Sequence, residues 1–213
     1  MGENMIKTVL FDVDGTIIDT EFVMIKSLQK TLLEELNLNV PDENLEYILG
    51  IPGKKAIERY ASSEEAIDTL HSIWADNVKL YTHHAKLFPN LEQTLVKLKD
   101  NGIQLGIVTS KTDEEMKNEF DHFGLNDFFD VSVTASDTEK HKPNAEPILY
   151  ALRKFNSLAE ESIYVGDSIY DMQSSQSAGA KFALAKWGAK ENPLFSSADI
   201  TLESPLEILS HLE

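Results

Sequence analysis

Two aspartates stand where a short apolar run near the N-terminus ends. The run from Ile6 to Phe11 is followed directly by Asp12 and Asp14, and Gly15 comes next. An apolar run of this length is typical of a strand that is buried on both faces of a parallel sheet. Buried carboxylates are costly unless a partner compensates them, so we expect a metal site, a proton-transfer role, or both. The alternative is an ordinary turn, because Asp and Gly are common turn residues.

Polar residues also follow three later apolar runs. These residues are Thr109 after residues 103–108, Lys142 after residues 129–133, and Asp167 and Asp171 after residues 162–165. In open parallel sheets ligands bind beyond the carboxyl ends of the strands, so we expect all of these side chains at one edge. Mg²⁺ prefers oxygen ligands and takes carboxylates together with a substrate phosphate. Asp12, Asp167 and Asp171 are therefore the expected ligands, and Asp14 could add its backbone carbonyl.

The same edge offers groups that suit a phosphoryl group. Thr109 supplies a hydroxyl and backbone amides just before a predicted helix, which is a favourable position for an anion. Lys142 can neutralise charge on the carboxylates and on the transferred group. Ser110 could add a further donor to this pocket. We therefore expect Thr109, Ser110 and Lys142 to bind substrate.

Composition limits the classes of protein that fit the chain. Its 213 residues include 42% hydrophobic and 26% charged residues and no cysteine, which excludes disulfides and cysteine nucleophiles and fits a cytoplasmic protein. The sequence shows neither a membrane-spanning run nor a signal peptide. The net charge of −17 disfavours nucleic acid and anionic membranes as partners. The expected partner is a small phosphate ester, held by local positive charge, and the chain would be a monomer or homodimer.

Periodicity predicts an α/β fold with a helical insertion. After Phe88 helices alternate with strands, which indicates a doubly wound, Rossmann-like parallel sheet. The predicted strands are residues 6–11, 103–108, 129–133, 162–165, 181–185 and 198–202. Residues between the first strand and Phe88 have helical spacing throughout. We therefore predict a discontinuous catalytic core, residues 1–16 and 85–213, and a helical cap domain, residues 17–84.

Several helix boundaries can be predicted from capping patterns. In the insertion, Ile25, Leu28, Leu32 and Leu36 predict a first helix, and Asp42–Leu49 a second one that stops at Gly50. Ser62 and Glu65 form a capping-box pair before a third long helix. In the core, Thr112 with Glu115, and Ser204 with Glu207, predict the starts of two more helices.

Four segments, in order, resemble the four motifs of the haloacid dehalogenase superfamily. They are DVDGT from Asp12, VTS from Val108, KP from Lys142 and GDSIYD from Gly166. The insertion between the first two motifs resembles the C1-type helical cap of subfamily I. The chain is most similar to the phosphoglycolate phosphatase-like members, and the resemblance covers essentially its whole length.

The resemblance implies a role for each motif residue. Asp12 would attack phosphorus and form an aspartyl phosphate, and Asp14 would act as general acid and base. Thr109 and Lys142 would hold the phosphoryl oxygens. Asp167 would ligate Mg²⁺, with Asp171 as a ligand or a supporting residue. Dehalogenase members lack the second aspartate of the first motif, so Asp14 favours a phosphatase.

The substrate remains open at this point. The resemblance implies a magnesium-dependent phosphatase for a small organic phosphomonoester such as phosphoglycolate. A sugar-phosphate mutase like β-phosphoglucomutase, a nucleotidase and a pyrophosphatase are alternatives within the subfamily, and a non-catalytic phosphate-binding protein is a remote one. Lys54 and Lys55 lie where the family's cap presents a specificity loop, although exposed lysines at a helix start are common.

Overall fold

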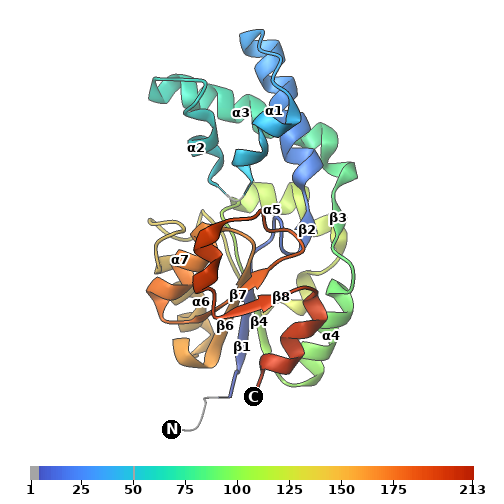
Figure 1. Cartoon of the computed structure of the whole chain (residues 1–213), viewed down its shortest axis with the longest axis vertical. Coiled ribbons are helices and arrows are strands. Elements are labelled where there is room, and N and C mark those ends of the chain that lie inside the picture. The colour runs from blue at the N-terminus through green and yellow to red at the C-terminus, as the bar shows by residue number, and fades with distance from the viewer. Residues whose placement is uncertain (1–4, 50) are drawn as a thin grey trace. The chain divides into compact units, whose positions relative to one another are not determined.

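The chain forms two compact units in a computed structural model that describes residues 5–49 and 51–213. Unit 1 comprises Met1–Ile18 and Leu87–Glu213, and unit 2 comprises Asp19–Lys86. Figure 1 traces the chain through both units. The two units meet between residues 18 and 19 and between residues 86 and 87. The sequence predicted these boundaries between residues 16 and 17 and between residues 84 and 85. At these two crossings the short strands β2 (Ile18–Asp19) and β3 (Lys86–Leu87) pair with each other.

Unit 1 is built on a six-stranded sheet in the order β5-β4-β1-β6-β7-β8, and every neighbouring pair is parallel. The strands are β1 (Thr8–Phe11), β4 (Gln104–Val108), β5 (Val131–Val133), β6 (Ser162–Gly166), β7 (Lys181–Ala185) and β8 (Ile200–Leu202). The predicted doubly wound parallel sheet is confirmed. All six predicted strands exist, with some ends shifted by one or two residues.

Helices cover both faces of this sheet, which makes the apolar strands possible. They are α4 (Leu91–Asp100), α5 (Asp113–Glu119), α6 (Glu146–Phe155) and α7 (Ile169–Ala178). In Figure 1, α6 and α7 cover one face, and α4 lies on the other with the C-terminal 3-10 helix Pro205–His211. The core beneath α6 and α7 centres on the fully buried Leu10, Tyr164 and Phe182.

The capping signals in unit 1 gave one correct and one wrong prediction. Thr112 and Glu115 form a complete capping box at the start of α5, as predicted. The last helix is a 3-10 helix instead of an α-helix, and the Ser204 side chain makes no capping hydrogen bond. The Glu207 carboxylate instead accepts from the backbone N–H of Glu203 at 2.9 Å.

Unit 2 is helical, with α1 (Glu21–Leu36), α2 (Gly53–Ile57) and α3 (Glu64–Tyr81). Its core lies between α1 and α3, where Leu28 and Leu32 belong to the same cluster as Trp74. The Trp74 indole N–H donates to the Ser27 hydroxyl at 2.8 Å, which satisfies both buried groups. Leu36, predicted to face this core, is exposed in the last turn of α1.

Two predicted boundaries in unit 2 are wrong. Residues 42–49 form the 3-10 turns Asp42–Asn44 and Glu46–Ile48 instead of one helix, with tight-turn hydrogen bonds such as Leu45 N–H to Asp42 O at 2.8 Å. The predicted stop at Gly50 lies outside the described residues. Ser63, and not Ser62, caps α3, and its hydroxyl accepts from the Ala66 N–H at 3.2 Å.

Candidate functional site

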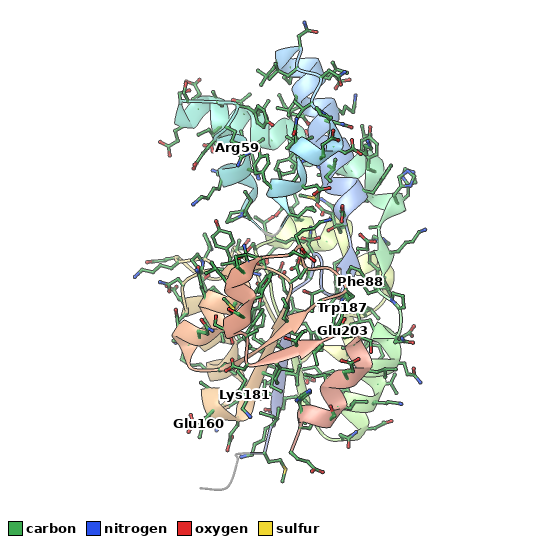
Figure 2. The ribbon with its side chains drawn as sticks, in the orientation of Figure 1. Arg59, Phe88, Glu160, Lys181, Trp187 and Glu203 are labelled. Atoms are coloured by element: carbon green, nitrogen blue, oxygen red, sulfur yellow. The ribbon has the colours of Figure 1, made fainter. Side chains whose placement is uncertain are left out.

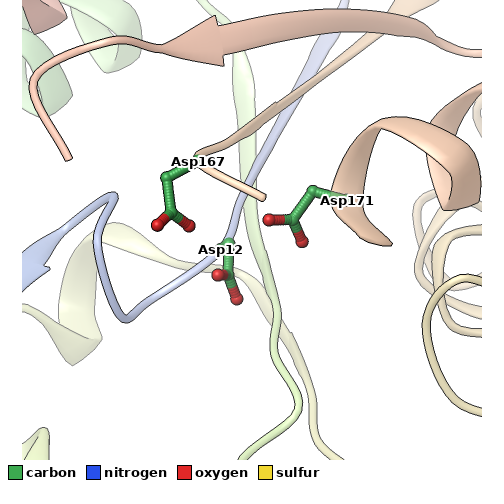
Figure 3. Close-up of side chains that lie close together, drawn as sticks. All are labelled: Asp12, Asp167 and Asp171. Atoms are coloured by element: carbon green, nitrogen blue, oxygen red, sulfur yellow. The ribbon is translucent and has the colours of Figure 1, made fainter. Parts of the chain in front are cut away.

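Three buried carboxylates meet at the carboxyl edge of the sheet. Asp12, Asp167 and Asp171 each offer a ligand oxygen, and these atoms all lie within 4.8 Å of one another. Figure 3 shows the three side chains converging from separate segments of the chain. Within residues 5–49 and 51–213 this is the one group of three or more potential metal ligands.

The strand register brings these segments together. Phe11 of β1 pairs with Val165 of β6, so both strands end at the same level of the sheet. Asp12 follows β1 directly and Asp167 follows β6 directly, whereas Asp171 lies in the first turn of α7. The residues that follow β1 and β6 therefore meet, because these two neighbouring parallel strands end at the same level of the sheet.

Two glycines make this close approach possible. Gly15 has φ +75°, and a Cβ atom there would lie 2.1 Å from Asp167 Oδ2. A Cβ atom on Gly166 would lie 2.5 Å from the Asp171 Cβ. Any larger residue at either position would displace a carboxylate of the cluster, which explains the glycine in both motifs.

Lys142 supplies the positive charge within the cluster. Its ammonium donates to Asp12 Oδ1 at 2.8 Å, to Asp171 Oδ1 at 2.6 Å and to the Tyr164 hydroxyl at 3.1 Å. Three partners use all three N–H groups of a lysine. Burial alone would lower the pKa of Lys142, but Asp12 and Asp171 outweigh burial and raise it, so the side chain stays charged.

One lysine does not balance three carboxylates. Burial raises the pKa of Asp12 from 3.8 to about 7, against the opposing effect of Lys142. Burial, followed by repulsion from Asp171 and Asp12, raises the pKa of Asp167 well above its usual range. Within the described chain Asp167 Oδ1 is buried and has no hydrogen-bond partner. An oxygen-only donor set with surplus negative charge and a free buried oxygen fits Mg²⁺.

Asp171 differs from the other two aspartates because its oxygens already have several partners. Oδ1 accepts from Lys142 and from the Tyr164 hydroxyl, and Oδ2 accepts from the N–H and the hydroxyl of Ser168. Ser168 and Asp171 together form the capping box of α7. The Tyr164 hydroxyl has one proton and also lies 2.8 Å from Val108 O, so Asp171 accepts from three donors of its own and shares the fourth.

Thr109 and Ser110 follow β4, which is hydrogen-bonded to β1 on the other side from β6. Thr109 is buried, and its backbone N–H donates to Val133 O at 2.9 Å, while its hydroxyl accepts from the Lys111 N–H at 3.2 Å. Ser110 is exposed. Phe11 pairs with Ile107, so Thr109 lies at the same edge of the sheet as Asp12.

Asp14 is held by a second buried lysine. The Lys111 ammonium lies 3.0 Å from Asp14 Oδ2 and 2.5 Å from Glu119 Oε2. Burial would lower the pKa of Lys111, but Asp14 and Glu119 raise it above its ordinary value. Burial, only partly offset by Lys111, raises the pKa of Glu119. Lys111 and Glu119 form a charged pair, because Lys111 has two carboxylate partners.

The sequence did not point to several of these residues. Lys111, Glu119 and Tyr164 belong to none of the four motifs. Glu119 ends the charged stretch from Asp113, where neither its type nor its spacing distinguishes it. Tyr164 was hidden within an apolar run, where its hydroxyl cannot be distinguished from ordinary core packing.

An aromatic pair supports the turn after Asp14. The Trp187 indole N–H donates to the backbone carbonyl of Thr16 at 3.0 Å. The rings of Trp187 and Phe88, both labelled in Figure 2, are 6.5 Å apart in an edge-on arrangement. Trp187 therefore fixes the backbone directly after the first motif.

Lys54 and Lys55 belong to unit 2 and lie on α2. Both are exposed, and the Lys54 ammonium pairs with Asp68 Oδ1 at 2.6 Å. Substrate contact by either lysine stays a prediction. Among the described residues, no helix has the length and apolar character needed to cross a membrane.

Comparisons with known proteins agree with this geometry. The family model for haloacid dehalogenase-like hydrolases matches residues 9–185. A relative from Caldanaerobacter subterraneus, provisionally named pyrophosphatase PpaX, is 38% identical over 85% of this chain and 82% of its own. The phosphoglycolate phosphatase of Aquifex aeolicus is 32% identical over 97% of both chains.

A solved structure has the same fold across almost the whole chain. CbbY from Rhodobacter sphaeroides, determined in complex with phosphate, has a TM-score of 0.80 and 23% identity. The match covers 98% of this chain and 99% of that one. The chain therefore belongs to the haloacid dehalogenase-like hydrolase family, and the expected resemblance is confirmed.

Proposed function

We propose that the protein is a magnesium-dependent phosphatase that hydrolyses a small phosphorylated anion through an aspartyl phosphate on Asp12. The observation that carries this proposal is the charge imbalance at the sheet edge. Three buried carboxylates lie beside one buried lysine, which pairs with two of them, Asp12 and Asp171, and burial raises the pKa of both Asp12 and Asp167. Buried ionisable groups whose pKa values are raised by burial and by one another gather at functional sites, and this cluster fits that pattern.

Asp12 is the nucleophile in this proposal. Its carboxylate attacks phosphorus in line, a bond forms between Asp12 and phosphorus, and the bond from phosphorus to the leaving oxygen breaks. Asp14 gives its proton to the leaving oxygen. Lys142 orients Asp12 through the 2.8 Å contact and balances charge on the phosphoryl oxygens.

The second half of the reaction frees the enzyme. A water molecule attacks the phosphorus of the aspartyl phosphate, Asp14 takes the proton from that water, and the bond to Asp12 breaks. Inorganic phosphate leaves and both aspartates return to their starting states. Thr109, buried at the end of β4, holds phosphoryl oxygens during both steps.

Asp12 and Asp167 would hold Mg²⁺, together with the backbone carbonyl of Asp14. When bound, the ion supplies positive charge that reduces the repulsion between the nucleophile and the phosphoryl oxygens. Asp171, whose two oxygens already accept from Lys142 and Ser168, would support the site instead of binding the ion directly. It holds Lys142 in place and caps α7.

Two substrates deserve first testing because similar proteins carry their names. Inorganic pyrophosphate follows from the 38% identical relative, and phosphoglycolate follows from the Aquifex aeolicus phosphatase. Both are small anions with one phosphoryl group to transfer. They differ in the leaving group, since a phosphate is a weaker base than the alkoxide of glycolate and needs less help from an acid.

The experiment is a phosphate-release screen with purified protein and Mg²⁺. It compares pyrophosphate, phosphoglycolate, sugar phosphates, nucleotides and p-nitrophenyl phosphate at equal free Mg²⁺. We expect hydrolysis that stops with chelator and in Asp12→Asn, with one of the first two compounds giving the highest kcat/KM. Asp14→Asn should slow phosphoglycolate more than pyrophosphate, because only the alkoxide depends strongly on a proton donor.

Two controls make this screen decisive. Asp130→Asn removes a surface carboxylate whose partner is Lys99 and should leave the kinetics unchanged. A mutase would interconvert sugar phosphates when primed with a bisphosphate and would release little phosphate. Undiminished hydrolysis by Asp12→Asn, or full activity in chelator, would overturn the proposed function.

A further inference from the structure

The carboxylate of Asp14 has two oxygens in very different settings. Oδ2 lies 3.0 Å from the Lys111 ammonium. Within the described residues, Oδ1 is buried and has no hydrogen-bond partner. One oxygen is therefore held, whereas the other remains available to a group that enters the site.

Lys111 is itself fixed on all sides. Its side chain is only 7% exposed, and its ammonium also binds Glu119 Oε2 at 2.5 Å. Its backbone N–H donates to the Thr109 hydroxyl at 3.2 Å, and its carbonyl accepts from the Ala135 N–H at 2.8 Å. A lysine with a fixed backbone and two carboxylate partners has little rotamer freedom left.

Glu119 acts as the second anchor of this lysine. It is the last residue of α5, and its side chain is 11% exposed. The capping box at Thr112 fixes the opposite end of the same helix, one residue after Lys111. The lysine therefore bridges a helix of the core and the turn that follows β1.

Burying this trio has a cost that packing does not explain. A lysine and a glutamate lose hydration when they are buried, and apolar residues of similar volume often serve stability equally well. A buried charged bridge that ends on one oxygen of a candidate acid–base residue is better explained by a need for orientation. A carboxylate held at one oxygen presents the other in a fixed direction.

We propose that Lys111, braced by Glu119, is a positioning residue that holds Asp14 by Oδ2 so that Oδ1 exchanges the proton. This inference rests on the proposed function, because it assumes the acid and base roles of Asp14. In the first half-reaction the proton passes from Oδ1 to the leaving oxygen as its bond to phosphorus breaks. In the second half-reaction Oδ1 receives the proton of the attacking water.

This role makes a prediction that depends on the leaving group. Phenolate needs a proton as it leaves, whereas p-nitrophenolate is a much weaker base and leaves without one. Phenyl phosphate and p-nitrophenyl phosphate have similar size and equal charge, so they form a matched pair. The value of kcat/KM reports the steps up to formation of the aspartyl phosphate, which isolates the acid role.

The test is the Lys111→Met variant with both aryl phosphates. We expect kcat/KM for phenyl phosphate to fall about 100-fold, the lower range for loss of a general acid, and that for p-nitrophenyl phosphate by less than about threefold. KM for phenyl phosphate should change little, whereas for p-nitrophenyl phosphate kcat and KM should fall together. With p-nitrophenyl phosphate a stoichiometric burst of p-nitrophenolate should appear, because the base-assisted hydrolysis of the aspartyl phosphate becomes slow.

Companion variants guard against a folding defect. Lys111→Arg keeps the charge and should recover most of the phenyl phosphate activity. Glu119→Gln removes the negative charge that pairs with Lys111 and leaves Asp14 unchanged. It should also lower kcat/KM for phenyl phosphate more than for p-nitrophenyl phosphate, with a smaller loss than in Lys111→Met. Lys99→Met removes a partly exposed lysine that pairs with Asp130 and should behave as wild type.

Two outcomes would overturn the inference. An equal loss for both substrates would mean that Lys111 only supports the fold, and a rise in KM alone would mean that it binds substrate. Neither outcome touches the proposed function, which is tested separately by Asp12→Asn and by chelator. If Lys111→Met does not fold, Glu119→Gln decides the question by the same ratio of the two substrates.

Discussion

At the level of individual residues, the central feature of this protein is a surplus of buried negative charge. Asp12, Asp167 and Asp171 lie together, Lys142 pairs with Asp12 and Asp171, and the pKa of Asp12 rises to about 7 because burial outweighs the lysine. Such a cluster destabilises the fold unless a cation joins it. Function and stability are therefore opposed at this site.

That opposition predicts how stability changes with pH in chelator. The pKa of Asp12 is raised in the folded state, so its contribution to stability is complete below about pH 4 and is lost as pH rises toward 7. Asp12→Asn has no such titration. Its free energy of unfolding, measured in urea with chelator, should therefore exceed that of the wild type increasingly from pH 4 to 7, by roughly 4 kcal/mol at most.

Mg²⁺ provides the control for this experiment. The ion binds the folded wild type and should raise its free energy of unfolding at pH 7, whereas Asp12→Asn should gain much less. A difference between the two proteins that stays constant across this pH range would contradict the charge imbalance.

The sequence could predict the residues that follow strands, and it could not predict those that support them. Asp12 and Lys142 were found because charged residues directly after buried strands or before a proline have few structural reasons to be there. Lys111, Glu119 and Tyr164 escaped prediction because their importance depends on which way each side chain points. That direction is set by tertiary packing between segments distant in the chain.

The sequence predicted the strands of the core more accurately than the short helical segments. All six core strands were predicted, because buried parallel strands are continuous apolar runs. Short helical segments were predicted less well. Residues 42–44, 46–48 and 205–211 form 3-10 turns, whereas the equally short α2 and α5 are α-helices, so segment length alone does not decide between the two.

The start of α3 gives a stability test at the level of one helix. Ser63 is the N-cap and its hydroxyl accepts from the Ala66 N–H, while Ser62, one residue earlier, is exposed. Ser63→Ala should lower the free energy of unfolding by about 1 kcal/mol, and Ser62→Ala by less than about 0.5 kcal/mol. Urea denaturation followed by circular dichroism measures both.

These two serines are a matched pair, because each substitution removes one exposed hydroxyl. A larger loss for Ser62→Ala would mean that α3 starts one residue earlier, as the capping-box pattern with Glu65 suggested. Equal losses would show that the cap hydrogen bond contributes nothing measurable.

The net charge of −17 acts on the molecule as a whole. A field of this sign repels an anionic substrate at long range, and salt screens it, since the Debye length falls from about 30 Å at 0.01 M to about 8 Å at 0.15 M. We expect kcat/KM for pyrophosphate to rise severalfold across this range of KCl at constant free Mg²⁺.

A substrate of lower charge serves as the comparison. The rise should be smaller for p-nitrophenyl phosphate, because the repulsion scales with substrate charge. A fall in kcat/KM with added salt would mean that local positive charge at the site dominates the approach of substrate.

The architecture of unit 1 was the most predictable feature of the molecule. Alternating strands and helices admit few topologies, because parallel crossovers are right-handed and short. The strand order then brings Asp12, Thr109 and Asp167 to one edge without any further information from the sequence. What the pattern could not supply is the identity of the substrate, since no residue type encodes it directly.

The stereochemical course at phosphorus tests the central claim most directly. A phosphorothioate ester made chiral with oxygen isotopes is hydrolysed in isotopically labelled water with Mg²⁺, and the configuration of the released thiophosphate is determined. Two in-line displacements, first by Asp12 and then by water, predict retention of configuration. Inversion would show that water attacks the substrate in a single step, and would contradict an aspartyl phosphate on Asp12.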